Sequence, residues 1–497
     1  MVLPKDIPTL EACSTKNYTR VDNLFCMENL IDRFISCDTY PHLCPQKTDH
    51  LPIISVLELE IEEAIQVAKY NFRSANWEEF RKCLEDKLAT VQIAENIPME
   101  EAFYEHIARL DSAIKAAIKE HVPISNPSPY TKRWWSKNLV RMKKCKERLA
   151  RKSYRRRAAD EDPVHEEFRQ AQNVYSKAIH DMKRDHWIEW LEMLDEEGLW
   201  VANRMVLGDG TDGGRNRILT LMVKDPVMKR IIKEARSNAD KGKLLYQDFF
   251  PKRTAPPAVD HIGTPVQEKW AYTFTTDEQI HRAIKRMKPW KATQSDTIPN
   301  AVFIYAREIL VPHLGPIFRA TDTLKVYPED WKLTETPILK KPGKSDYTST
   351  SAWRPIVLSN GYVRLLNSCK TEDLVLMCEK TGILPMNHFG GRPGRATTDS
   401  IHLLVKLVKD AWRKGEVATL LCLDVKAAFL SVAVDVLLQE MRECGIPLGH
   451  VDWFKRRIEG RKTSLLFDNY KSDTFNIKEG IDQGDAHSLV AWIIYNH

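Results

Sequence analysis

The stretch Leu420–Phe429, LLCLDVKAAF, joins an apolar run to a single carboxylate. Such a run is typical of a buried strand, so Asp424 is predicted to lie at the carboxyl end of one. A buried carboxylate costs free energy unless a positive group meets it. Mg²⁺ is one such group, because it prefers carboxylate oxygens and keeps positions open for phosphates. The alternatives are a helix cap or an ion-pair partner, since the residues that follow are predicted to turn into a helix.

The composition restricts the class of protein. The chain has 497 residues, of which 43% are hydrophobic and 29% charged, and this balance predicts packed domains of about 150 residues each. The sequence contains no run of 18 apolar residues and no apolar N-terminal segment after a basic start, so neither a membrane span nor a secretory signal is predicted. The ten cysteines form no C-x-x-C pair, which argues against a zinc ribbon or a disulfide framework and for reduced thiols inside a cell.

A basic segment lies between Thr131 and Arg157, where thirteen residues are Lys or Arg and one, Glu147, is acidic. Such a segment suits a polyanion, and aromatic rings beside cations are suited to stacking on bases. The alternative is a solvated helix face. The residues predicted to bind nucleic acid are Lys132, Arg133, Trp134, Trp135, Lys143, Lys144, Arg155, Arg156 and Arg157.

Several elements are expected around these features. Strands are predicted within residues 20–27 and 51–60, and helices within 77–121 and 166–194. Thr276 and Gln279 are predicted to form a capping box at the start of a further helix. Residues 461–480 are predicted to form a hairpin that leads to a turn with Gly480, Gln483 and Gly484, followed by a helix.

The C-terminal motifs, taken in order, resemble the reverse transcriptase domain of non-LTR (LINE-type) retrotransposons. The segments that carry the resemblance are ETPILKKPGKSDYTSTSAWRPIVLSN, NHFGGRPGRATTDSIHLLV, LDVKAAFLSV and GIDQGD, within residues 290–496. The resemblance implies that Asp424 and the carbonyl of Val425 bind Mg²⁺ in a two-metal site, and that Phe429 lies under the sugar of the incoming nucleotide. It also implies that Lys340 and Arg354 hold the triphosphate. Gln483 and Gly484 would contact the nucleotide and the template.

A second resemblance concerns residues 19–34 and 47–59, TRVDNLFCMENLIDRF and KTDHLPIISVLEL. They resemble the C-terminal end of the endonuclease/exonuclease/phosphatase fold, which precedes the polymerase in LINE elements. This implies that His50 contacts the scissile phosphate, that Asp22 orients its imidazole, and that Asp49 lies on the metal side.

These features predict an α+β chain in four parts. The parts are a remnant of an α/β-sandwich nuclease (1–62), a helical connector (63–125), a basic helical linker (126–260), and the fingers and incomplete palm of a right-hand polymerase fold (270–497). The expected partners are an RNA template, a DNA target or primer, and deoxynucleoside triphosphates. We expect a location in the nucleus, and make no prediction for the oligomeric state.

Departures from the family limit the expected activity. We expect the chain to begin inside the nuclease and to end after the second palm motif. It contains no Asp-Asp pair, which the next palm hairpin of the family carries, and Ala486 and His487 replace the usual proline and apolar residue. Two-metal transfer needs several carboxylates to hold two cations about 4 Å apart. We therefore predict that the chain alone neither polymerises nor nicks. The alternative function is non-catalytic RNA or DNA binding by the basic helices; an intron maturase shares the palm motifs but lacks a nuclease-like segment before them.

Overall fold

The structure is a computed structural model in which two units are distinguished by their internal contacts. One unit comprises Met1–Lys69 and Ser125–Gly213, and the other Tyr70–Ile124 and Gly214–His497. The boundaries between the units fall in β5 (Lys69–Tyr70), in β6 (Ile124–Ser125) and between residues 213 and 214. The residues that the structure describes are 2–12, 17–44, 48–58, 69–89, 91, 95–125, 134–159, 161–193, 202, 217–225, 228, 230–251, 267–425 and 427–496.

The contacts divide the predicted basic linker (126–260) between the two units, because its residues up to 213 belong to the first unit and those from 214 onward to the second. The N-terminal segment groups with the basic helices, and the connector helices group with the polymerase-like part. The predicted limits of the individual parts stay predictions. None of the helices in the described ranges combines the length and the apolar character that crossing a bilayer requires.

The N-terminal segment contains two antiparallel strand pairs. β1 (Leu10–Glu11) pairs with β2 (Tyr18–Thr19), and β3 (Phe34–Thr39) pairs with β4 (Ile53–Leu57). β4 confirms the strand predicted within residues 51–60. The strand predicted within residues 20–27 is wrong, because these residues pair with no described strand; instead the N–H groups of Val21 and Asp22 donate to Thr9 Oγ1 at 3.1 and 2.9 Å.

The basic segment forms a helical hairpin in the first unit. α3 (Lys137–Arg155) packs against α4 (Pro163–Glu192), which confirms the long helix predicted there. Asp162 caps α4 by accepting the N–H of Val164 at 2.9 Å, and the proline at the first helical position suits that start. Each of these helices buries few residues, which lie on a narrow stripe facing the other helix.

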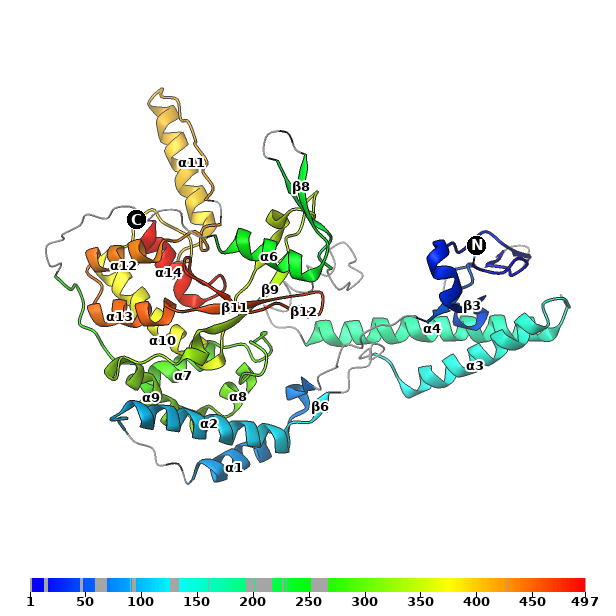
Figure 1. Ribbon diagram of the computed structural model, residues 1–497, viewed down its shortest axis with the longest axis horizontal. Helices are drawn as coiled ribbons and strands as arrows, with labels where there is room; N and C mark the ends of the chain where they lie inside the picture. Colours follow the sequence, from blue (N-terminus) through cyan, green and yellow to red (C-terminus); the bar gives the residue numbers. More distant parts are fainter. Residues whose placement is uncertain are drawn as a thin grey trace. The chain divides into compact units, whose positions relative to one another are not determined.

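The second unit contains the main core, which most of its helices form (Figure 1). The capping box predicted at Thr276 and Gln279 is present at the start of α7, and Ile280, Ala283 and Ile284 are buried as their spacing requires. The helices of this unit are α1 (Trp77–Leu88), α2 (Glu100–His121), α6 (Asn238–Phe249), α7 (Asp277–Arg286), α8 (Asn300–Tyr305), α9 (Arg307–Thr323), α10 (Gly361–Thr381), α11 (Thr397–Arg413), α12 (Val434–Glu443), α13 (Leu448–Ile458) and α14 (Ala486–Tyr495).

A five-stranded sheet lies beside this core (Figure 1). β10 (Trp353–Pro355) pairs antiparallel with β9 (Leu333–Lys340), β9 pairs parallel with β11 (Lys462–Phe467), and β11 also pairs with β12 (Tyr470–Lys471) and β13 (Phe475–Asn476). The predicted hairpin is confirmed. Its two-residue turn, Asp468–Asn469, has φ values of 52° and 61°, the left-handed pair that matches the twist of two hairpin strands. A separate pair, β7 (Leu221–Lys224) and β8 (Ile231–Ala235), belongs to the same unit.

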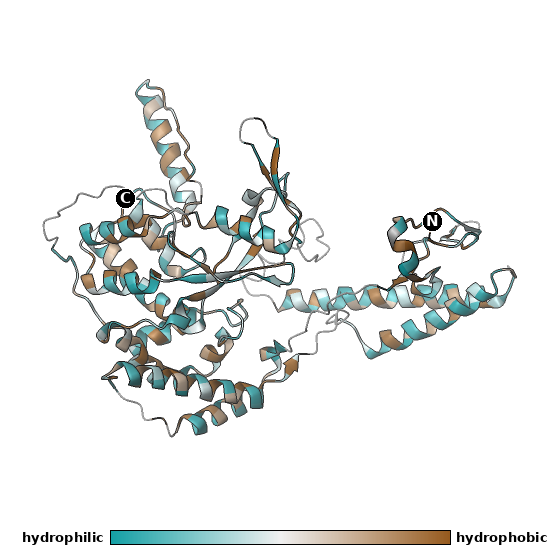
Figure 2. Cartoon of the chain, viewed as in Figure 1, coloured by the Kyte–Doolittle hydropathy of each residue, from teal (hydrophilic) through white to brown (hydrophobic). Residues whose placement is uncertain are grey.

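The strand predicted to end at Asp424 is wrong for this structure. Residues 416–425 form neither helix nor strand, and Val417, Leu421 and Leu423 are 91%, 78% and 84% exposed. A strand is stable only where a neighbouring backbone takes up its hydrogen bonds, and no described strand lies beside this segment. The preceding α11 buries none of its residues and extends away from the unit (Figure 1), although apolar and polar residues alternate along it (Figure 2).

An ion pair inside the helical core joins α9 to α10. Lys370 Nζ lies 2.7 Å from Asp322 Oδ2 and donates to the Tyr272 hydroxyl at 2.8 Å, while that hydroxyl donates to Asp322 Oδ1 at 2.6 Å. The two charged side chains are 0% and 2% exposed. Buried charges of this kind are tolerated only as a complete set.

We expect the Lys370→Met variant to lose about 3–5 kcal/mol of unfolding free energy, because Asp322 would stay buried without its cation. Chemical unfolding of the full chain, followed by tryptophan fluorescence, measures the loss. Lys82→Met is the matched control: Lys82 forms an exposed pair with Glu78, so its removal should cost less than about 1 kcal/mol. Equal losses in the two variants would contradict the assignment.

Candidate functional site

The turn Gly480–Asp485 is hydrogen-bonded to two separate segments of the second unit. The N–H groups of Gly480 and Ile481 donate to the carbonyls of Val432 and Phe429, each at 2.8 Å, and the N–H of Val357 donates to the Gln483 carbonyl at 3.0 Å. Gly480 has a φ of +79°, and a Cβ there would lie 2.8 Å from the Leu430 carbonyl oxygen. The two predicted nucleotide-contacting residues, Gln483 and Gly484, lie in this turn, and the segment with Phe429 is bonded to it.

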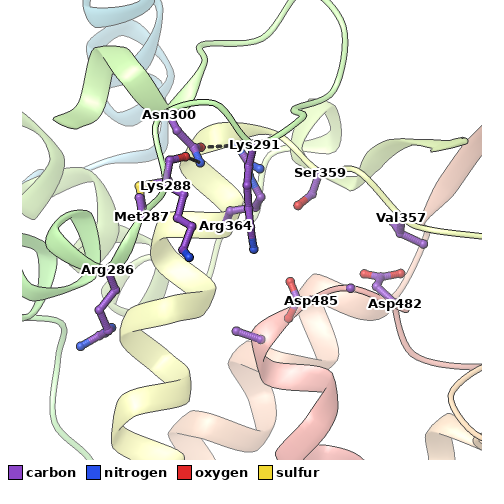
Figure 3. A pocket seen from close by; sticks show the side chains of 12 residues that line it. Arg286, Met287, Lys288, Lys291, Asn300, Val357, Ser359, Arg364, Asp482 and Asp485 are labelled. Carbon is purple, nitrogen blue, oxygen red and sulfur yellow. Dashed lines mark hydrogen bonds between the residues drawn. The ribbon is translucent and has the colours of Figure 1, made fainter. Parts of the chain in front are cut away.

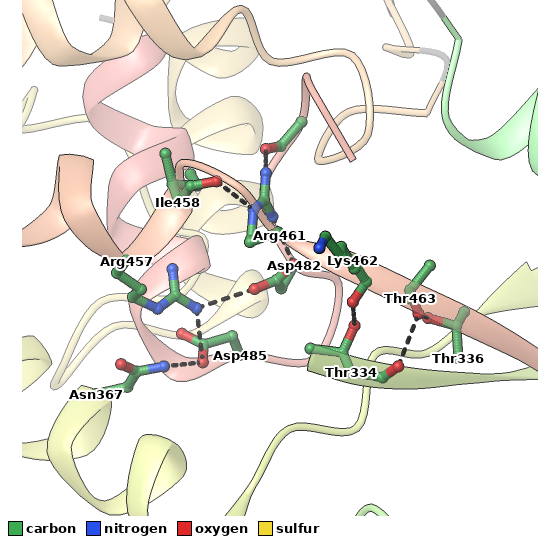
Figure 4. Close-up of polar contacts among 11 residues, drawn as sticks. Thr334, Thr336, Asn367, Arg457, Ile458, Arg461, Lys462, Thr463, Asp482 and Asp485 are labelled. Atoms are coloured by element: carbon green, nitrogen blue, oxygen red, sulfur yellow. Dashed lines mark hydrogen bonds and ion pairs between the residues drawn. The ribbon is translucent and has the colours of Figure 1, made fainter. Parts of the chain in front are cut away.

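A buried ionic network lies beneath the turn (Figure 4). Arg461 Nη1 donates to Asp482 Oδ1 at 2.6 Å, and Arg457 Nη2 lies 3.1 Å from both Asp482 Oδ2 and Asp485 Oδ2. Asn367 adds a donor to Asp485 at 2.5 Å. Burial raises the pKa of Asp482, but the guanidinium groups of Arg461 and Arg457 outweigh it and hold the pKa below its usual value. The network therefore fixes the turn from its inner side.

A cavity of about 250 Å³ opens beside the outer side of the turn (Figure 3). Arg364, on α10, contributes a guanidinium whose partners are neutral: it donates to the Asn300 side-chain oxygen and to the Ala292 carbonyl. The other basic side chains come from the end of α7 and the loop after it. The lining residues are Arg286, Met287, Lys288, Lys291, Asn300, Val357, Ser359, Arg364, Asp482, Gly484, Asp485 and Ala486.

The charge of this cavity is positive. Its two carboxylates, Asp482 and Asp485, are already paired with Arg457. Arg286 is compensated by Glu372 at 2.7 Å, whereas Lys291 is exposed and has no ion-pair partner among the described residues. An excess of cations around a hollow of this size can bind phosphate oxygens.

The predicted pair Lys340 and Arg354 lies on neighbouring strands, but on opposite faces. In the antiparallel register Lys340 faces Trp353, and Arg354 faces Leu339. Directly opposed residues share a face, and adjacent residues alternate. The structure therefore does not bring these two side chains together. Their predicted roles at the triphosphate stay predictions.

The structure brings Lys341 to the face of Arg354 instead. Its N–H donates to the Ala352 carbonyl at 2.9 Å, which continues the ladder by one pair. Burial and the nearby charge of Arg354 lower the pKa of Lys341. Lys340 lies with its Nζ 4.0 Å from the ring centroid of Tyr347, on the other face. The choice between Lys340 and Lys341 depends on the register of β9 and β10, which the sequence pattern does not specify.

Asp424 and Val425 lie in the exposed segment 416–425, whereas Phe429 packs against the main core of the second unit. Phe429 is half-buried, with its ring centroid 6.2 Å from that of Trp492 on α14. Asp424 makes no hydrogen bond or ion pair with the residues that the structure describes. Over those residues, the only three-ligand group of His, Cys, Asp and Glu is Cys83, Glu120 and His121, on α1 and α2. The residues around Asp424 therefore do not form a complete magnesium site, and the predicted role of Mg²⁺ stays a prediction.

The three residues predicted for the nuclease remnant lie together in the first unit. His50 Nδ1 is 2.7 Å from Asp22 Oδ2, and this hydrogen bond raises the pKa of His50. Thr9 holds the backbone of Asp22, and the Asp49 carbonyl accepts the N–H of Glu11 at 2.9 Å. The geometry matches an imidazole oriented by a carboxylate; the roles of the three residues stay predictions.

The predicted nucleic-acid-binding residues divide into packed and exposed ones. Trp134 and Trp135 are half-buried and pack against the small core of the helical hairpin. Their rings therefore contribute to packing, a role that the sequence pattern did not predict. Lys132 and Arg133 lie outside the described residues. The exposed members are Lys143, Lys144, Arg155, Arg156 and Arg157.

Partners reduce the free charge of this exposed set. Arg156 pairs with Asp162 at 2.9 Å, and Lys143 lies 3.7 Å from Glu147. The guanidinium of Arg157 lies over the Tyr154 ring at 4.4 Å. Lys144 and Arg155 have no such partner among the described residues, so they are the best placed of the set to contact a phosphate.

A pair of histidines is buried between α13 and α14. His450 Nε2 and His487 Nε2 are 3.0 Å apart, both side chains are fully buried, and their Nδ1 atoms have no partner among the described residues. Burial lowers the pKa of His450 to about 3, with a smaller effect from Lys370, and burial also lowers the pKa of His487 well below its usual value. Both imidazoles are therefore neutral, and one donates to the other.

We expect Gly480→Ala to destabilise the second unit by about 3 kcal/mol, because the new Cβ meets a backbone carbonyl in addition to the left-handed φ. Gly382→Ala is the matched control: Gly382 has a φ of +67° and open space around its Cβ position, so about 1 kcal/mol is expected. Chemical unfolding of both variants measures the two losses of unfolding free energy. Equal losses of unfolding free energy in the two variants would show that the contact with the Leu430 carbonyl does not add to the effect of the left-handed φ.

We expect stability to fall as the pH drops below about 6.5, because the unfolded chain then binds protons that the buried histidines cannot. Each histidine should contribute a slope of up to about 1.4 kcal/mol per pH unit until its folded pKa is reached. His487→Leu should reduce the slope, and the exposed His402→Leu should leave it unchanged. Unfolding curves between pH 7 and 4 measure it, and an unchanged slope in His487→Leu refutes the assignment.

Residues 338–497 match the family described as "Reverse transcriptase (RNA-dependent DNA polymerase)". Among curated proteins, the chain is 26% identical over 238 residues to the "Probable RNA-directed DNA polymerase from transposon X-element" of Drosophila melanogaster. It is 24% identical over 247 residues to the "RNA-directed DNA polymerase from mobile element jockey" of Drosophila funebris. These matches cover 48% and 50% of this chain, but only 26% and 27% of the relatives. Residues 338–497 are therefore similar to a reverse transcriptase domain, and about half of the chain's length is similar to transposon RNA-directed DNA polymerases.

Proposed function

We propose that the chain is a fragment of a retrotransposon RNA-directed DNA polymerase, and that the turn Gly480–Asp485 is where its second unit contacts template and nucleotide. The observation that carries the proposal is the position of this turn, between the buried arginine network and the cationic cavity. A turn held by these ion pairs presents Gly484, which lines the cavity, without further ordering, and a site that is already ordered loses less entropy on binding.

The cavity supports contact with the sugar–phosphate backbone. The lysines and the arginine that line it, Lys288, Lys291 and Arg364, surround a space next to Gly484. Backbone contacts of this kind position a strand without reading its sequence. Arg354 and Lys341, which share a face at the end of β9 and β10, are the proposed ligands of the triphosphate, with Lys341 in place of Lys340.

The ancestral reaction that we propose is target-primed reverse transcription. In it, the Asp22–His50 pair belongs to the remnant of an endonuclease that cut the target DNA, and Asp49 lies beside it. The 2.7 Å bond between the two side chains supports this assignment. We place the protein in the nucleus on the same grounds.

We also propose that these 497 residues do not complete nucleotide addition. Asp424 belongs to no group of three or more potential metal ligands among the described residues, and the sequence contains no Asp-Asp pair. Two-metal transfer requires several carboxylates around the same two ions.

The exposed cations of α3 favour a second candidate function, non-catalytic binding of RNA or DNA by the first unit. Lys144 and Arg155 are the residues proposed to contact phosphates in this function, since neither is paired with a described residue. The two candidate functions predict that the affinity for nucleic acid depends on different lysines and arginines.

We expect the full chain to bind a primed RNA template with an affinity that falls steeply with salt. Replacing both Lys288 and Lys291 by Glu should weaken binding about tenfold and reduce the salt slope by about two, one for each phosphate that a lysine no longer neutralises. Lys285→Glu, an exposed lysine on α7 that does not line the cavity, is the control and should have a small effect. Fluorescence anisotropy over a series of salt concentrations measures all three.

If the cavity variant binds normally while Lys144→Glu with Arg155→Glu abolishes binding, the second candidate function holds and the first is wrong. Primer extension on the same template, with Mg²⁺ and deoxynucleoside triphosphates, tests the proposed inactivity. Measurable extension by the purified chain would overturn that part.

A further inference from the structure

The helix pair α1 and α2 carries a cluster of side chains that the proposed function does not use. Glu79 and Cys83 lie one turn apart on α1, so they share a face, and Glu120 and His121 are the last two residues of α2. The ligand atoms of Cys83, Glu120 and His121 all lie within 4.8 Å of one another. Glu79 Oε2 lies 3.8 Å from His121 Nδ1, beyond hydrogen-bond distance.

We propose that Cys83, Glu120 and His121, with Glu79 as the fourth ligand, form a zinc site that ties the end of α2 to α1. A thiolate, an imidazole and carboxylates are ligands that Zn²⁺ accepts together, and a thiolate disfavours Mg²⁺ and Ca²⁺. Bond lengths of about 2.0–2.3 Å place tetrahedral ligand atoms about 3.3–3.8 Å apart. Cys83 Sγ and Glu120 Oε2 are 3.3 Å apart, so this pair already has the required separation.

The hydrogen bonds of the cluster allow the ion to enter with few changes. The Cys83 thiol donates to Glu120 Oε2. On binding, this proton leaves to solvent and the metal takes its place between sulfur and oxygen, so one proton is released per ion. The other oxygen of the carboxylate, Oε1, accepts from Lys87 Nζ at 2.8 Å, and this bond can remain as the outer support of the ligand.

The charge of Lys87 is the main interaction that opposes zinc binding. Its ammonium group lies on the same face of α1, one turn beyond Cys83, and repels a second cation. The carboxylates of Glu79 and Glu120 and the thiolate supply three negative charges against the two charges of the ion and the one of Lys87. The set is therefore neutral with zinc bound.

The position of the site gives it a structural role. α1 packs into the main core through Phe80 and Leu84, and α2 through Ile114 and Ile118, so each helix is held by apolar contacts on its inner face. The zinc ligands add a link between the two helices. Because metal binding free energy becomes folding free energy, zinc should raise the stability of this helix pair.

Titration of the metal-free full chain with Co²⁺, followed by competition with Zn²⁺, tests the proposal. We expect one ion per chain, a thiolate-to-cobalt charge-transfer absorption in the near ultraviolet, and release of one proton per ion. The Cys83→Ser variant should lose that absorption, and His121→Gln should bind zinc at least about tenfold more weakly. Zinc should raise the unfolding temperature of the wild-type chain and not that of Cys83→Ser.

A further variant completes the design. Cys422→Ser, an exposed cysteine in the same unit, should keep the absorption unchanged. Absence of bound cobalt, or an absorption that survives in Cys83→Ser, would overturn the proposal. None of these outcomes depends on nucleic-acid binding or polymerisation.

Discussion

The second unit depends on the ion pairs that Arg457 and Arg461 make with Asp482 and Asp485. All four side chains are nearly inaccessible to water, with exposed fractions between 3% and 7%. A charge buried in this way is stable only while its partners are present, so the network holds as a whole or fails as a whole. It joins the end of α13, the start of β11 and the N-cap of α14, and thereby fixes the Gly480–Asp485 turn between them.

This constraint explains why the proposed site is ordered on one side and open on the other. The turn and Phe429 share backbone hydrogen bonds and pack on the core, whereas the segment that ends at Asp424 exposes its leucines and valines. Backbone groups in a strand need a neighbouring strand, and the described sheet offers none there. The proposed template-contacting surface is therefore ordered in this fold. Asp424, the metal-binding carboxylate that the family resemblance assigns to the site, lies in the exposed segment and is not part of that surface.

The side chain of His487 illustrates what a departure from the family pattern costs. The residue lies in the core, where an apolar side chain is usual, and its imidazole finds one hydrogen-bond partner in His450, while both Nδ1 atoms have no partner among the described residues. Unsatisfied buried polar atoms each reduce stability by about 1–3 kcal/mol. The hydrogen bond between the two rings offsets part of that cost.

Elements whose signals are local could be predicted from the amino-acid sequence alone. The capping box at Thr276, the helices of the basic segment and the hairpin around Asp468–Asn469 follow from spacing and turn chemistry. The turn with Gln483 and Gly484 could also be predicted, because glycines mark where backbone must turn sharply. Which side chains meet depended instead on how distant segments pack. The register of β9 and β10 selects Lys341 over Lys340, and the apolar run before Asp424 remains unpaired, because sheet partners and faces are set by segments far away in the chain, which no local pattern specifies.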